Sequence, residues 1–115
     1  MIFLHIPFPF LVPPVITVTP PILNNVIGST VRFWCMAVSD RDPVVISWLH
    51  NGRPAVIDDY HTHLLSNNDY VVSQLWWEDE GIYQCEAKNA AGSVLAAGSV
   101  SIIACKFPYL VKNVM

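Results

Sequence analysis

Two cysteines and one tryptophan at wide intervals constrain the fold of this chain more than any other feature. Trp48 follows Cys35 by 13 residues, and Cys85 follows Cys35 by 50 residues. Cys85 also ends the motif D-x-G-x-Y-x-C, in which Tyr83 stands two positions earlier. Alternate residues of a β-strand point to the same face, so Tyr83 and Cys85 are expected to point together. Any fold for this chain has to accommodate both the spacing and the motif.

The middle of the chain, residues 17–103, alternates with a period of two residues. Within it, Val31, Phe33 and Cys35 are expected on one face of a strand, with Trp34 on the opposite face. No window carries a sustained apolar stripe with the helical period of 3.6 residues, so we expect strands and few helices. In the last strand five alternate residues share one face: Val94, Ala96, Gly98, Val100 and Ile102.

Turn-forming residues separate these alternating runs. The pair Asn51-Gly52 is a strong hairpin signal, because both residue types tolerate positive φ. Further turn signals lie at residues 39–43, 66–69 and 89–92. Short strands divided by turns at this spacing predict an all-β fold, a two-sheet antiparallel sandwich.

The spacing and the motif together resemble the I-set branch of the immunoglobulin superfamily, a Greek-key sandwich. The resemblance covers most of the chain, from about Val15 to Ile103. The stretch DEGIYQCEAKNAAG is most similar to adhesion and guidance receptor ectodomains, including netrin-receptor-like and Dscam-like proteins. Outside the motif, the matching positions are Gly28, Val31, Phe33, Cys35, Ile46, Trp48, Tyr70, Val72, Leu75, Ala87, Asn89 and Gly92.

This resemblance implies structural roles for the motif residues. It implies that a disulfide between Cys35 and Cys85 joins the two sheets and packs against Trp48. It also implies that the Tyr83 hydroxyl bonds to upstream backbone and that Gly81 allows a tight turn. A disulfide that closes a loop of about 50 residues stabilises a domain by roughly 4 kcal/mol in the chain-entropy model. Because such bonds persist in oxidising compartments, an extracellular or cell-surface location is expected.

Asp79 occupies the family position that usually pairs with an arginine. Here the corresponding residue is His61. We prefer the interpretation in which Asp79 caps a turn through backbone N–H groups and His61 is solvated. The alternative is a pH-sensitive pair between Asp79 and His61.

The ends of the chain are strongly apolar. We expect residues 1–14 to be a proline-rich extension, residues 15–103 to be the immunoglobulin domain, and residues 104–115 to be a C-terminal tail. The first segment lacks the basic region and the cleavage site of a signal peptide. We therefore expect the chain to be a fragment of a larger multi-domain protein. Cys105 is expected to have no partner, and a bond to another chain is the alternative.

Composition and motifs argue against several functions. The net charge of −3 provides no basic field for phosphates, which argues against nucleic acid as a partner. The sequence has no nucleophile elbow, phosphate-binding glycine loop or zinc-protease motif, so we expect no enzyme, cofactor or small-molecule substrate. His61 and His63, near Asp58 and Asp59, offer two imidazoles where zinc needs three or four ligands. No metal site is therefore expected.

Three tryptophans are candidates for an interface. Trp34 alternates with inward-facing residues and should lie on the outer face of one sheet, which it would share with Val71. Trp76 and Trp77 precede an acidic run and should form a second apolar patch at one end of the sandwich. Exposed tryptophans are enriched in protein contacts. The alternative is that these rings cover the margin of the core and have no partner.

The expected function is that of a non-catalytic immunoglobulin module for cell adhesion or receptor–ligand recognition. Its expected partners are proteins: other immunoglobulin or fibronectin-type domains, a cell-surface ligand, or a second copy. Two alternatives stay open. One is an intracellular, titin-like I-set domain of a muscle or cytoskeletal scaffold. The other is an accessory domain of a receptor kinase, receptor phosphatase or matrix enzyme.

Overall fold

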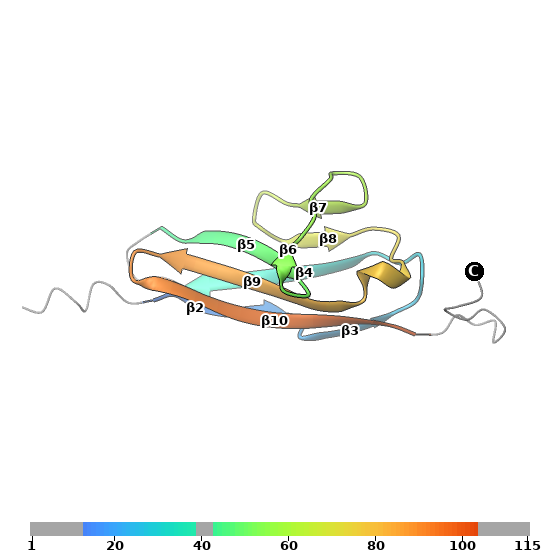
Figure 1. Cartoon of the computed structure of the whole chain (residues 1–115), viewed down its shortest axis with the longest axis horizontal. Coiled ribbons are helices and arrows are strands. Elements are labelled where there is room, and N and C mark those ends of the chain that lie inside the picture. Colours follow the sequence, from blue (N-terminus) through green and yellow to red (C-terminus); the bar gives the residue numbers. More distant parts are fainter. Residues whose placement is uncertain (1–12, 39–42, 104–115) are drawn as a thin grey trace, which may run out of the picture.

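The computed structural model describes residues 13–38 and 43–103, which form two β-sheets packed face to face (Figure 1). One sheet has the strand order β2-β4-β8-β7, and the other has the order β3-β10-β9-β5-β6. A single 3-10 turn, η2, precedes β9 within this part of the chain. The elements are β2 Val15–Thr19, β3 Ile22–Asn25, β4 Val31–Val38, β5 Val45–His50, β6 Arg53–Pro54, β7 Thr62–Leu64, β8 Tyr70–Val72, η2 Trp77–Asp79, β9 Gly81–Asn89 and β10 Gly92–Ile102.

The predicted all-β sandwich is confirmed, but one strand pair differs from the antiparallel expectation. Strand β3 runs parallel to β10, with Ile22 opposite Ser99 and Asn25 opposite Ile102. The preceding strand, β2, instead pairs with β4 in the other sheet. Pro20 separates the two strands, and proline cannot donate a ladder hydrogen bond. The first extended run of the chain is thus divided between the two sheets.

The turns lie where the sequence predicts them. Asn51 and Gly52 connect β5 to β6 and have φ values of 51° and 83°. This is the positive-φ pair that a tight two-residue hairpin needs. Asn89 faces Gly92 across the hairpin between β9 and β10. The predicted loop at residues 39–43 lies, except for Pro43, outside the described residues.

The core between the sheets is rich in aromatic side chains. Ring centroids of Phe33 and Tyr83 are 5.3 Å apart, those of Tyr70 and Tyr83 are 5.6 Å apart, and those of Trp48 and Tyr70 are 5.8 Å apart. Burying one such side chain stabilises the fold by about 1.5–3 kcal/mol. Strand β4 shows the predicted alternation, because Phe33 is fully buried while Trp34 is exposed. The other buried apolar side chains are Val18, Val31, Val72, Leu75, Cys85, Ala87 and Val100.

The strands run from Val15 to Ile102, so they fall inside the domain predicted at residues 15–103. The two predicted flanking segments and Cys105 fall, apart from Pro13 and Pro14, outside the described residues, and their assignment stays a prediction. Across residues 13–38 and 43–103, no helix has the length and hydrophobicity that crossing a membrane would require.

Candidate interaction surfaces

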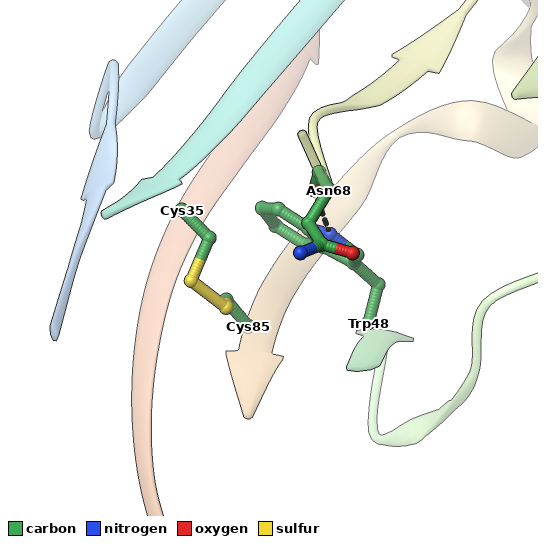
Figure 2. The surroundings of a disulfide bond; sticks show 4 residues. All are labelled: Cys35, Trp48, Asn68 and Cys85. Atoms are coloured by element: carbon green, nitrogen blue, oxygen red, sulfur yellow. Dashed lines mark hydrogen bonds between the residues drawn. A yellow bond between two sulfur atoms is a disulfide. The ribbon is translucent and has the colours of Figure 1, made fainter. Parts of the chain in front are cut away.

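A disulfide joins the two sheets at the position that the resemblance implies (Figure 2). Cys35 comes from β4 and Cys85 from β9, and their Cα atoms are 6.1 Å apart. Trp48 in β5 lies directly opposite Cys85 and is buried beside the bond. Its indole N–H donates to the carbonyl oxygen of Asn68 at 2.8 Å. This bond fixes the ring, so the bridge and the tryptophan form one rigid support for both outer faces.

Asp79 is the centre of a hydrogen-bond cluster at one end of the sandwich. Its carboxylate oxygens lie 2.9 and 3.0 Å from Nε2 of His61, and Oδ2 also accepts the backbone N–H of Trp76 at 2.8 Å. The Tyr83 hydroxyl donates to the Asp79 carbonyl at 2.7 Å, as expected for a tyrosine corner. The expected capping by Asp79 is present. The preferred interpretation that His61 is solvated is wrong, because its ring reaches the carboxylate and only 32% of its side chain is exposed.

Gly81 begins β9 with a backbone conformation that favours glycine. Its φ is 133°, and a Cβ atom added there would collide with the side chain of Asn51. Asn51 occupies that space because its Oδ1 accepts the N–H of Ile82 at 2.9 Å. The turn into β9 therefore depends on a glycine and on a partner from the β5–β6 turn.

Asp58 closes a turn before β7 that the sequence analysis missed. Its Oδ1 accepts backbone N–H groups from Tyr60 at 2.9 Å, His61 at 2.8 Å and Thr62 at 3.0 Å. The N–H groups of Thr62, Tyr60 and His61 hold the pKa of the Asp58 carboxyl well below its usual range. An aspartate that bonds the backbone two to four residues ahead is a common turn signal. That signal was available in the stretch DDYHT.

The titratable groups near this end have structural roles. Burial raises the pKa of Tyr70 to about 12 and raises that of Tyr83 further, so both hydroxyls stay protonated as donors. His50 stacks on Tyr83 at 4.2 Å, and its Nε2 donates to the Glu80 carbonyl at 2.9 Å. A hollow of about 400 Å³ lies among these groups. Among the described residues, no three His, Cys, Asp or Glu side chains are grouped closely enough to hold a metal ion.

A row of apolar side chains lies on the outer face of the β2-β4-β8-β7 sheet. We call Val15, Trp34, Met36 and Val38 the outer stripe. Their exposed fractions are 68%, 42%, 63% and 68%. Val15 faces Val38 across the β2–β4 pair, while the other members alternate along β4. Only Trp34 was singled out from the sequence. The same period-two pattern continues to Met36 and Val38, so the signal for the rest was present.

Arg32 is a neighbour of both Trp34 and Val71 in the β2-β4-β8-β7 sheet. The Arg32 guanidinium lies 5.6 Å from the centre of the Trp34 ring and forms an ion pair with buried Asp69 at 2.6 Å. Arg32 is also directly opposite Val71 in the β4–β8 pair. Val71 is therefore half-buried beside Arg32 and lies at the margin of the outer stripe. The pair between Arg32 and Asp69 was not predicted from the sequence, because its members are 37 residues apart.

The other two candidate tryptophans lie in and before η2. Trp76 is 37% exposed, while Trp77 is half-buried, and their ring centroids are 6.5 Å apart. Beside Trp76 is an open hollow of about 690 Å³, which we call the end hollow. Its walls are Ile27, Gly28, His61, Gln74, Leu75, Trp76 and Glu78. Trp77 is not among the lining residues, and an interface patch formed by both rings stays a prediction.

Comparison with known proteins identifies relatives that are similar over part of their length. The chain is 32% identical over 68 residues to the neural/ectodermal development factor IMP-L2 of Drosophila melanogaster, covering 59% of this chain and 25% of that protein. It is 34% identical over 93 residues to human protogenin, covering 81% of this chain and 8% of that protein. The chain thus spans a quarter or less of the length of these two relatives.

Solved structures share the fold. The crystal structure of IMP-L2 has a TM-score of 0.72 at 27% identity, covering 82% of this chain and 45% of that one. The N-terminal four immunoglobulin domains of Dscam1 isoform 4.44 give a TM-score of 0.64 at 22% identity, covering 79% and 21%. The chain therefore shares its fold with the immunoglobulin domains of Dscam1. Residues 13–89 match the family described as immunoglobulin domain. Because this match covers more than half of the sequence, the chain belongs to the immunoglobulin domain family.

Proposed function

We propose that this domain is a non-catalytic protein-recognition module of an extracellular or cell-surface adhesion protein. We further propose that the outer stripe is its contact surface. The observation that carries this proposal is the alignment of four exposed apolar side chains on one rigid sheet face. Aligned exposed apolar side chains of this kind mark protein contacts.

The chemistry of the stripe suits a protein partner. Tryptophan, methionine and arginine are enriched at protein interfaces, and an aromatic anchor contributes a large share of binding energy. Here Trp34 and Met36 would supply the anchors, and Arg32 would lie at their polar margin. Arg32 also holds the Trp34 ring in place, so the surface loses little side-chain freedom on binding. The partner would be another immunoglobulin or fibronectin-type domain, a cell-surface ligand or a second copy.

The disulfide and the relatives support the proposed location. A bond between Cys35 and Cys85 persists in an oxidising compartment, and the similar ectodomains belong to adhesion and guidance receptors. Residues 15–103 would then be the folded module within a longer chain. We would express the full chain through a secretory pathway and map its disulfides without reduction. A secreted product with this bond is expected. A retained product, together with a cytosolic preparation that folds with free thiols, would contradict the location.

A binding experiment tests the surface. The secreted chain would be screened against an array of ectodomains that includes the chain itself. The double substitution W34S/M36S is expected to weaken any specific contact at least tenfold, because two apolar anchors are lost. The matched control is L95S, since Leu95 is 53% exposed on the other sheet. Contacts that survive W34S/M36S but are lost in L95S would overturn the assignment of the surface, as would the absence of any protein contact.

A further inference from the structure

The turn between β5 and β6 places polar groups on both sides of one side-chain amide. Asn51 and Gly52 form this turn with positive φ values, and both residues are exposed. The Oδ1 atom of Asn51 accepts the backbone N–H of Ile82 at 2.9 Å, and its Nδ2 atom lies 3.4 Å from Nε2 of His50. The amide of Asn51 is therefore held between a hydrogen-bond donor from β9 and an imidazole from β5.

The residue after Asn51 supplies a nucleophile. Asn51-Gly52 is the only Asn-Gly pair in the sequence. The backbone nitrogen of a residue that follows asparagine can attack the side-chain Cγ and close a cyclic imide, because both groups belong to the same short segment. Glycine hinders this attack least, since it has no Cβ atom, and the space around Gly52 is open.

The surroundings of the amide match the charges that such an attack creates. Negative charge develops on Oδ1 of Asn51, and donors about 2.7–3.1 Å away stabilise an oxyanion. The Ile82 N–H lies within that range. In its imidazolium form, His50 can give a proton to Nδ2, which has to leave. The His50 ring is held in place by stacking on Tyr83 at 4.2 Å and by its 2.9 Å bond to the Glu80 carbonyl.

We propose that Asn51 is a site of spontaneous modification, at which the folded chain converts its own asparagine to aspartate and isoaspartate. The Gly52 nitrogen bonds to Cγ of Asn51 and loses its proton to solvent. The bond from Cγ to Nδ2 breaks, Nδ2 leaves as ammonia with a proton from His50, and His50 regains a proton from solvent. Water then opens the cyclic imide at either carbonyl. The net reaction consumes water, releases ammonia in equal amount and needs no oxidant or second enzyme.

The modification changes the edge of the larger sheet. Either product adds a negative charge beside Arg53, which faces His50 across the hairpin. In isoaspartate the main chain gains a methylene carbon, so the two-residue turn no longer has the geometry that joins β5 to β6. The bond from the Asn51 N–H to the Ile82 carbonyl, 2.8 Å long, would be lost with that geometry. The outer stripe lies on the other sheet, so this chemistry does not depend on the proposed function.

The test follows the secreted full chain, kept folded at neutral pH and body temperature. Samples are digested at intervals, and mass spectrometry with electron-transfer fragmentation measures aspartate and isoaspartate at each asparagine. Asn89 is the internal control, because it also lies at a hairpin turn and its Oδ1 also accepts a backbone N–H, from Ala91 at 2.9 Å. Alanine follows it instead of glycine. Asn51 is expected to convert at least about tenfold faster than Asn89. Equal rates would overturn the proposal.

A substitution tests the part played by His50. H50F keeps a ring that can stack on Tyr83 but removes the proton donor, and circular dichroism would establish that it is folded. Conversion of Asn51 in H50F is expected to be about tenfold slower, because the general acid is lost. The matched control H63F changes a histidine in β7 and should leave the rate unchanged. An H50F rate equal to the native rate would overturn the proposal.

A second comparison needs no substitution, so it applies even if H50F does not fold. The native chain is unfolded in guanidinium with its disulfide reduced, and its conversion at Asn51 is measured beside that of the folded chain. Slower conversion in the unfolded chain is expected, because unfolding separates Asn51 from the Ile82 N–H. Faster conversion in the unfolded chain would show that the hairpin protects Asn51, and the proposal would then be wrong.

Discussion

At the scale of single residues, the stretch from Trp76 to Cys85 shows how short-range chemistry fixes a turn. The Asp79 carboxylate accepts a backbone N–H from before η2, and its carbonyl accepts the hydroxyl of Tyr83. Most of this was predictable, because capping aspartates and tyrosine corners act within a few residues. The Arg32–Asp69 pair was not, because its two members come together only once β4 and β8 pair.

Asp58 should make stability depend on acid pH. The folded-state pKa of Asp58 is depressed, so this residue's contribution to the free energy of unfolding is fully present above the unfolded-state pKa, near pH 4. The contribution is lost as the pH falls from there toward the lower folded-state pKa. Thermal unfolding from pH 5 to pH 2 should show a steep fall of Tm in the native chain. The variant D58N should show a shallower fall over the same range. Parallel curves for the two proteins would contradict this role.

Gly81→Ala should destabilise the domain by roughly 2–4 kcal/mol, because it combines a positive φ with a collision against Asn51. Gly92→Ala is the matched control. Gly92 also has a positive φ, of 148°, but has open space around it, so about 1 kcal/mol is expected. Urea unfolding of both variants measures the difference. Equal losses would show that the contact with Asn51 carries no cost.

At the scale of elements, the alternation of apolar and polar residues predicted most of the strands. It also predicted the face that each strand buries, because side chains on one face of a sheet recur every two residues. Alternation did not predict how the first extended run is divided between the sheets, since Val15–Thr19 and Ile22–Asn25 both mix apolar and polar residues. The prolines between them marked a break, but a break does not specify the sheet that the next strand joins. That choice depends on β10, about 75 residues later.

The contact between His61 and Asp79 connects the segment before β7 to η2. His61→Ala should lower the free energy of unfolding by about 1–2 kcal/mol, because Asp79 would lose a hydrogen-bond partner in a largely buried site. His63→Ala is the control, since His63 lies opposite Val71 at the sheet edge, and its effect should stay within about 0.5 kcal/mol. Chemical unfolding at pH 7 compares them. Equal effects would remove the structural role of the pair.

At the scale of the whole molecule, the disulfide is the contact that ties one sheet covalently to the other. Replacing both Cys35 and Cys85 with alanine should remove about 4 kcal/mol, since the bond closes a loop with a sequence separation of 50 residues. Against a typical total of about 5–15 kcal/mol, this would leave about 1–11 kcal/mol, so the variant would be marginally stable at the lower end of that range. Urea unfolding of the secreted double variant measures the loss, and a change below about 1 kcal/mol would contradict it.

The pairing of β3 with β10 has a mechanical consequence. The chain enters the sandwich near Val15 and leaves it at Ile103, at opposite ends of the molecule. When the flanking chain is pulled from both sides, β3 and β10 are drawn past each other along their length, because the two strands are parallel. Their backbone hydrogen bonds then bear the load together, in shear, and must break in one event. The domain should resist tension far better than if these bonds opened one at a time, as in a zipper.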